Sequence, residues 1–341
     1  MATTTTIGII NKLKLQIIMK ELKDINFNGN IVLKDNRVKG AILPKTAAEL
    51  ERDITIQSDT IIEGAVYARK LELQQGDIDI QGAIYTQLEF HVNTAAGGKI
   101  VLHKTVASSD AIVSFAKDCQ LIFLADVNGK QVKLSNAFVA GSIFADNINL
   151  ENCVVLGGIF ATQTAYIKNC VMGTFNIPDV TLQGTNYLLL PSAFTTQKIK
   201  TSPTTLLYNL SLADLGNLYR GLPQQESSGI IRMDLDADEL RSDLSADNKQ
   251  LLLLCYTVVG KVLATELLDT RKLQNHFIIG ATSLHDQLFQ EYDLGMDKDN
   301  QPCKVTPEKT ADFFFRILKG TIEIQEIEGN FSIEEVAQKF L

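Results

Sequence analysis

A short phrase that recurs through the first half of this chain constrains the fold more than any other feature of the sequence. Each copy is a glycine, a small residue, an aliphatic residue and an aromatic residue, and most neighbouring copies are 16 to 18 residues apart. The copies are Gly64-Ala-Val-Tyr67, Gly82-Ala-Ile-Tyr85, Gly141-Ser-Ile-Phe144, Gly157-Gly-Ile-Phe160 and the shortened Gly173-Thr-Phe175. A glycine at a recurring position indicates a corner, where the backbone has a positive φ or approaches another segment closely.

Apolar residues alternate with polar ones between the glycines, as at Ile78, Ile80 and Ile84. This period of two predicts strands with one buried face. Strands cut by corners at this short period leave no room for helices, so the repeat predicts a β-solenoid, a right-handed parallel β-helix. A β-sandwich with similarly placed glycines is the alternative. We expect structural corners at five glycines of the repeat: Gly64, Gly82, Gly141, Gly158 and Gly173.

A second phrase, Asn-Cys-Val, occurs at 152–154 and again 17 residues later at 169–171. In a solenoid of this period Cys153 and Cys170 would be adjacent rungs of one interior ladder. A buried free cysteine behaves as a small hydrophobe, so we expect core packing rather than redox or metal chemistry. Near the two ends of the solenoid, alternating runs predict that Val32 and Val180 point inward, with a register uncertain by one residue.

The glycine-small-aliphatic units at this spacing resemble the bactofilin domain over residues 25–190. The resemblance implies a bacterial, polymer-forming cytoskeletal protein whose right-handed β-helix associates end to end. Bactofilins usually carry short disordered tails, whereas here a segment of about 135 residues with a net negative charge follows the repeat. Residues 93–135 also interrupt the phrase, and their glycines at 97–98 and 129 predict turns.

Charge and composition divide the chain into unlike parts. Residues 1–204 carry 19 Lys+Arg and 18 Asp+Glu (net +1), and residues 205–341 carry 13 and 22 (net −9), which together give −8. A Ser/Thr/Pro-rich stretch at 191–210 between them predicts a linker. We therefore expect an N-terminal segment 1–24, a β-helix domain 25–190, the linker, and an acidic, mostly helical domain 211–341.

Helical patterns fill much of the last part. A broad apolar face over 246–269 predicts a buried helix. Thr306-Pro307-Glu308 predicts the start of another helix, with Pro307 at its first position, and Gly320 predicts its end. That helix carries Phe313, Phe314 and Phe315, which we interpret as core residues or, alternatively, as a partner-binding patch.

The N-terminal residues 7–22 are apolar with interspersed lysines. They would cap the open edge of the first coil, or they would lie on an anionic membrane as a peripheral contact. No stretch has the roughly 18 uninterrupted apolar residues of a membrane span. The overall acidity disfavours nucleic acid as a partner, and the absence of a signal-peptide pattern favours a cytoplasmic location.

Candidate chemistry is sparse. Five cysteines without a CxxC pair disfavour a disulfide framework and a zinc site. The run Asp297 to Glu308 has calcium-loop spacing, but Pro302 stands where the sharp turn needs glycine. An acyltransferase-like β-helix enzyme would need His91 or His103 as a catalytic residue in a cleft. The repeat of this chain lacks the strict six-residue period of that enzyme class. The sequence therefore predicts no catalytic residue, no cofactor and no metal.

These observations lead to three functional hypotheses. The first is a non-enzymatic, bactofilin-like scaffold that self-associates end to end and presents the C-terminal domain to an unknown protein. The second is an adaptor with both rod ends capped, which binds a partner without polymerising. The third and weakest is the acyltransferase-like enzyme.

Overall fold

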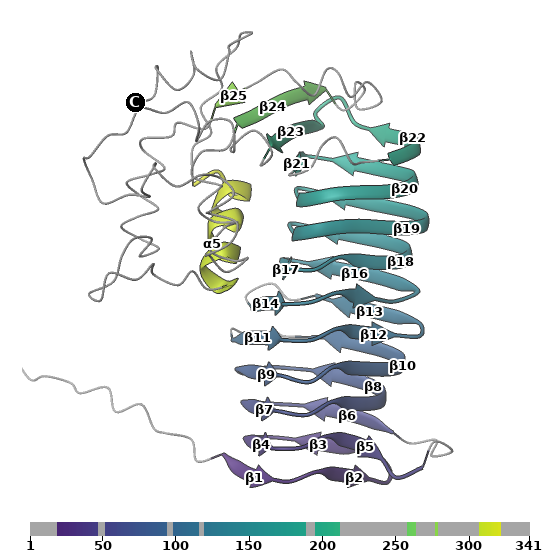
Figure 1. Ribbon diagram of the computed structural model, residues 1–341, viewed down its shortest axis with the longest axis vertical. Helices are drawn as coiled ribbons and strands as arrows, with labels where there is room; N and C mark the ends of the chain where they lie inside the picture. Colours follow the sequence, from purple (N-terminus) through teal and green to yellow (C-terminus); the bar gives the residue numbers. More distant parts are fainter. Residues whose placement is uncertain are drawn as a thin grey trace, which may run out of the picture.

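The computed structural model describes residues 19–46, 52–93, 98–115, 119–188, 195–211, 258–263, 277–278 and 307–321. From residue 20 to residue 201 these form a parallel β-solenoid of about nine turns. Figure 1 shows the turns stacked along one axis as a rod. The predicted solenoid is therefore confirmed, and the β-sandwich alternative is wrong.

Three parallel ladders form the sides of the rod, and we call them faces A, B and C in the order in which each coil visits them. Some strands bend around the corner from face B to face C and belong to both. Face A contains β1 (Lys20–Leu22), β4 (Asn36–Val38), β7 (Thr60–Ile62), β9 (Ile78–Ile80), β11 (Lys99–Leu102), β14 (Gln120–Phe123), β17 (Ala137–Val139), the starts of β19 (Val154–Lys168) and β20 (Val171–Gln183), β21 (Thr185–Leu188) and β23 (Leu206–Ser211).

Faces B and C follow in the same way. Face B contains β2 (Ile25–Phe27), β5 (Ile42–Pro44), β12 (Val106–Ser108), β15 (Val127–Asn128), the starts of β8 (Val66–Leu73), β10 (Ile84–Val92), β18 (Ile143–Glu151) and β22 (Thr195–Thr201), and the middles of β19 and β20. Face C contains β3 (Ile31–Leu33), β6 (Asp53–Ile56), β13 (Ala111–Ser114), β16 (Gln131–Ser135) and the ends of β8, β10, β18, β19, β20 and β22.

Alternation of inward and outward side chains builds one continuous core inside the rod. On β6 the inward Ile54 and Ile56 are buried, and their partners on β8, Leu71 and Leu73, are buried too. Like residues stack on like residues along the axis because each coil repeats the register of its neighbour. The expectation for Val180 is confirmed, since it is buried, but the one for Val32 is wrong: Val32 is 60% exposed, and Leu33 beside it points inward.

Glycines form two columns at the corner between faces A and B. A Cβ on Gly82 would lie 2.1 Å from the carbonyl oxygen of Gly64, and one on Gly173 would lie 2.4 Å from that of Gly157. None of the repeat glycines at this corner has a positive φ, so close backbone approach is the reason for glycine here. The corner position between Gly141 and Gly173 is held by Gly157 rather than by the predicted Gly158. Gly158 lies one residue further along the chain, in register with Thr174 on face B.

At the corner between faces C and A, asparagine residues with a positive φ turn the chain. Asn136, Asn152 and Asn169 all have φ between 51° and 54°, which asparagine tolerates better than most residues. This explains the repeated Asn-Cys-Val phrase: asparagine makes the turn, and the next residue points inward. The Cys153 amide donates a hydrogen bond to Cys170 Sγ across 3.4 Å, so the expectation of adjacent interior rungs is confirmed.

The interruption of the phrase at 93–135 does not interrupt the solenoid. Val106 and Val127 continue the inward column of Ile84 on face B. By this register Lys104 and Ala125 occupy the corner positions that glycine holds in other coils. Where Gly129 predicted a turn, strand β15 precedes this glycine.

The boundaries of the solenoid are wider than expected. β1 starts at Lys20, inside the segment 1–24, and β22 pairs with β20 inside the stretch expected to be a linker. That stretch has the polar composition of a loop, but the open edge of β20 offers it hydrogen-bond partners. Residues 191–194 lie outside the described residues.

Beyond residue 211 the structure describes two strands and one helix. β24 (Val258–Leu263) pairs antiparallel with β23, and β25 (Phe277–Ile278) pairs antiparallel with β24. The prediction of a helix over 246–269 is therefore wrong at 258–263. A short apolar run is compatible with a buried strand as well as with a helix. α5 (Pro307–Leu318) confirms the helix that starts at Pro307, and Gly320 follows it with a φ of 69°. The rest of the expected helical domain lies outside the described residues.

Candidate functional site

An apolar column on the outside of face A is covered by α5. The register joins Val101, Ile122, Phe138, Val154 and Val171 in successive coils, and all five are buried although they point away from the core. Figure 1 shows α5 beside the face A strands. This column is the only part of the described solenoid exterior where five successive rungs are apolar and buried.

The helix contributes the opposite apolar surface. Ala311, Phe314 and Ile317, spaced three residues apart, are buried. An ion pair joins Lys99 Nζ on β11 to Glu308 Oε1 in the first turn of the helix, at 2.6 Å. Of the expected phenylalanine patch, Phe314 is buried, Phe315 is half-buried, and the side chain of Phe313 lies outside the described residues.

The two ends of the rod differ. At the C-terminal end β24 lies antiparallel on β23 and occupies the face A edge. At the N-terminal end β1, β2 and β3 each have one strand neighbour among the described residues. Three inward residues of this first coil, Leu22, Ile25 and Ile31, are only partly buried, whereas Phe27 and Leu33 beside them are buried.

Charged groups lie beside that open end. Lys39 donates a hydrogen bond to Glu21 Oε2 at 3.0 Å, and this bond, with the charge of Lys39, lowers the pKa of the Glu21 carboxyl. Both side chains are more than half exposed, so the pair contributes little to stability. The segment predicted to cap this edge or to touch a membrane lies, through residue 18, outside the described residues.

The two histidines of the solenoid lie on different faces of the rod. His91 lies on face C with its ring edge against Phe115, whereas His103 follows β11 on face A and contacts Asp79 at 3.3 Å. Within the described ranges no three His, Cys, Asp or Glu residues are placed to hold a metal ion. Residues 297–303 of the calcium-like run lie outside those ranges, and its last member, Glu308, pairs with Lys99.

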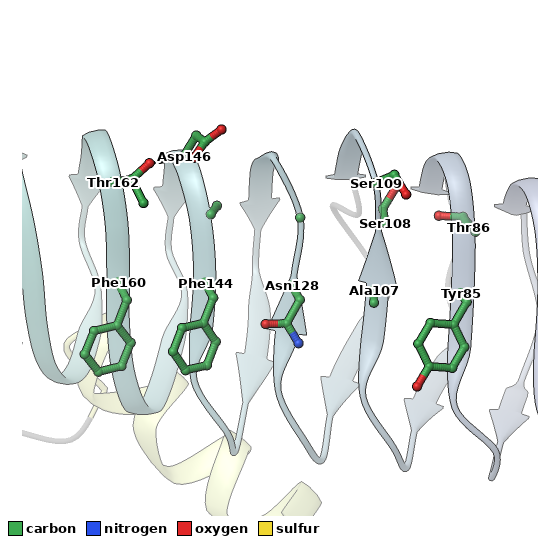
Figure 2. Close-up of a pocket in the computed structure, with 12 residues that line it drawn as sticks. Tyr85, Thr86, Ala107, Ser108, Ser109, Asn128, Phe144, Asp146, Phe160 and Thr162 are labelled. Atoms are coloured by element: carbon green, nitrogen blue, oxygen red, sulfur yellow. Dashed lines mark hydrogen bonds between the residues drawn. The ribbon is translucent and has the colours of Figure 1, made fainter.

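A shallow groove of about 520 Å³ lies on face B, which the sequence reasoning did not single out. The aromatic column, by which we mean the outward row of face B, runs through it. In order along the axis the column consists of Tyr67, Tyr85, Ala107, Asn128, Phe144 and Phe160. Figure 2 shows the last five of these residues in one row across neighbouring strands. The signal was present in the sequence, because the four rings are the fourth residues of the repeated phrase.

The rings form two parallel pairs. The ring centroids of Tyr67 and Tyr85 are 5.0 Å apart at an interplanar angle of 21°, and those of Phe144 and Phe160 are 5.0 Å apart at 10°. The two small side chains of Ala107 and Asn128 separate the pairs and leave the depression. Polar side chains border it along the turn that follows the row; they are Thr86, Ser108, Ser109, Asp146 and Thr162.

Neutral polar groups dominate the rim of this groove. Among the described residues that line it, Asp146 is the one acidic residue and none is Lys, Arg or His. The Asp146 carboxylate accepts a hydrogen bond from the Thr162 hydroxyl. The hydroxyl of Thr86 is buried without a hydrogen-bond partner in the described part of the chain. The groove therefore combines exposed aromatic rings with hydroxyl and amide groups and one carboxylate along its rim.

Comparison with known proteins adds no family assignment: no family model, no curated protein and no solved structure matches this chain. In the part of the chain that the structure describes, no helix combines the length and apolarity needed to cross a bilayer.

Proposed function

We propose that this protein is a non-enzymatic, bactofilin-like scaffold, located in the cytoplasm, whose rods associate through the N-terminal coil. The observation that carries the proposal is the difference between the two rod ends. At the C-terminal end β24 runs antiparallel on the last face A strand and blocks parallel stacking there, while β22 on faces B and C has no second neighbour among the described residues. At the N-terminal end nothing in the described residues pairs with the outer edges of β1, β2 and β3 on any of the three faces.

An unpaired parallel edge is a template for another chain. Its free N–H and C=O groups can form main-chain hydrogen bonds with the edge of a second rod. The partly buried Leu22, Ile25 and Ile31 would become buried in that interface. Association at one end only produces a pair of rods rather than a filament. The C-terminal region would then present a surface to a partner protein.

The capped adaptor is the second candidate. Residues 20–22 of the predicted capping segment form β1 of the first coil, so the position of residues 7–18 distinguishes the adaptor from the scaffold. If this segment covers the first coil, both ends are closed and the protein stays monomeric. If it lies on an anionic membrane, the edge stays open and the pair of rods forms at that surface.

Light scattering coupled to size-exclusion chromatography, with negative-stain microscopy of the full chain, tests the proposal. We expect discrete particles that shift from one rod to two as the concentration rises. Long filaments would contradict the proposal that β24 on face A blocks stacking at the C-terminal end. A monomer at every concentration would contradict self-association and favour the adaptor.

A further inference from the structure

The aromatic column of face B exposes apolar surface in a way that the rest of the described exterior does not. Of six exposed large hydrophobic side chains in the described ranges, three lie in this column: Tyr67, Tyr85 and Phe144, at 41–43% exposure. Exposed rings gathered in one row indicate a contact surface for another molecule.

The column is long and straight. Five rungs separate Tyr67 from Phe160, which at about 4.8 Å per rung corresponds to roughly 24 Å along the axis. Three rungs separate Tyr85 from Phe144, or roughly 14 Å. A ligand that uses both ring pairs is therefore an elongated chain that lies along the rod and across the strands.

The lining excludes two classes of chain. An anionic chain, such as a nucleic acid, would find no cation among the groove residues and would meet the Asp146 carboxylate. A peptide that binds by strand addition would need a free sheet edge, but the strands under the groove have both edges paired: β10 with β8 and β12, and β18 with β15 and β19.

A neutral polysaccharide satisfies every feature of the groove. The C–H-bearing faces of pyranose rings pack on aromatic rings, and their hydroxyl groups need donors and acceptors at the side. Tyr85 and Phe144 supply the rings, and Asn128, Ser109, Asp146 and Thr162 supply the polar groups. From this geometry we infer that the face B groove binds a neutral glycan chain along the solenoid axis. The inference is independent of association at the rod ends, because the groove lies on the side of the rod.

Retention of the full-length protein on immobilised polysaccharides tests the inference. The panel contains glycogen, cellulose, xylan, mannan and chitin as neutral polymers, and pectate as an anionic one. We expect retention on at least one neutral polymer, unchanged when the salt concentration is raised, and none on pectate. Retention on glycogen would indicate that the natural ligand is a storage polymer. Retention on a β-linked polymer would indicate a cell-wall polymer.

Titration calorimetry with soluble oligosaccharides of the retained polymer measures the contribution of the rings. Phe144→Ala should weaken binding about tenfold, which is the effect of removing one stacking ring from sites that bind nucleic-acid bases. Phe115→Ala is the matched control, because Phe115 is 48% exposed but lies after β13 on face C, outside the groove. Unchanged melting temperatures show that the variants are folded.

Three results would overturn the inference. The first is failure of the full chain to bind any neutral polymer, and the second is a preference for pectate. The third is equal binding by Phe144→Ala and the wild type.

Discussion

Gly82 lies directly against the backbone of Gly64, one coil below it, so that a Cβ on Gly82 would come within 2.1 Å of the Gly64 carbonyl oxygen. The contact atom belongs to a strand corner whose position is held by the ladder hydrogen bonds on either side, as in the bond from the Val66 amide to the Ala83 carbonyl. The corner therefore cannot move away as a flexible side chain would.

Gly82→Ala should destabilise the solenoid by roughly 1–3 kcal/mol, because the added methyl group overpacks a rigid corner. Its φ is not positive, so alanine would otherwise stabilise the chain by about 0.4–1 kcal/mol through the unfolded state, and the steric effect has to exceed this gain. Chemical denaturation measures the difference. Gly129→Ala is the control, since its Cβ would meet nothing closer than 3.3 Å; equal stabilities of the two variants would contradict the explanation.

Ile31→Lys should prevent the pairing of rods. Ile31 points inward at the open N-terminal coil, so a second rod would bury the lysine without a partner charge. Val32→Lys is the matched control on the same strand, because Val32 already faces solvent. Light scattering should show a monomer for Ile31→Lys and wild-type association for Val32→Lys. If both variants associate like the wild type, the N-terminal coil is not the interface.

Phe314→Ala should loosen α5 from face A. The Phe314 ring lies on the face of α5 that packs on the solenoid, and it is buried. Truncation of a buried phenylalanine costs roughly 3–5 kcal/mol of stability. Hydrogen exchange of β14 and β17 amides, which lie under the outward Ile122 and Phe138, should become faster. Glu308→Gln, which removes only the partly exposed ion pair with Lys99, should cost less than about 1 kcal/mol and leave exchange nearly unchanged. Equal exchange in the wild type and Phe314→Ala would show that the helix does not protect this face.

Burial raises the pKa of the Cys170 thiol well above its ordinary value, with a further contribution from the neighbouring Cys153. The thiol therefore stays neutral in the folded protein at pH values where it ionises in the unfolded chain. The contribution to stability is full below about pH 8.5 and is lost as the pH rises further, by at most about 1.4 kcal/mol per pH unit.

Denaturation of the wild type and Cys170→Ala at pH 7 and pH 10 tests this effect. The free energy of unfolding should fall more steeply with pH in the wild type, because only it carries the titrating thiol. Thiol reagents should also label Cys153 and Cys170 only after unfolding. A steeper fall in the alanine variant, or rapid labelling of the native protein, would contradict the burial of these thiols.

Local sequence patterns were sufficient for the class of fold and for several of its details. Alternating apolar residues and recurring glycines predicted the parallel coils, since period-two burial and tight corners are properties of a few neighbouring residues. The 17-residue separation of Cys153 and Cys170 predicted their contact, because one coil has that length. Thr306 and Pro307 predicted the start of α5, because the first turn of a helix tolerates a residue without an N–H.

Tertiary structure alone decided register, boundaries and surfaces. Whether Val32 or Leu33 points inward, and whether Gly157 or Gly158 occupies the corner, depends on hydrogen bonds to the neighbouring coil, and a slip of one residue reverses every side chain. β22 and β24 became strands because an adjacent edge offered them partners, although their own sequences favoured a linker and a helix. The face B groove exists because stacking brings Tyr85 and Phe144, 59 residues apart, into one row with two small residues between them. No pattern within one coil encodes that juxtaposition, since it arises only when successive coils are stacked in register.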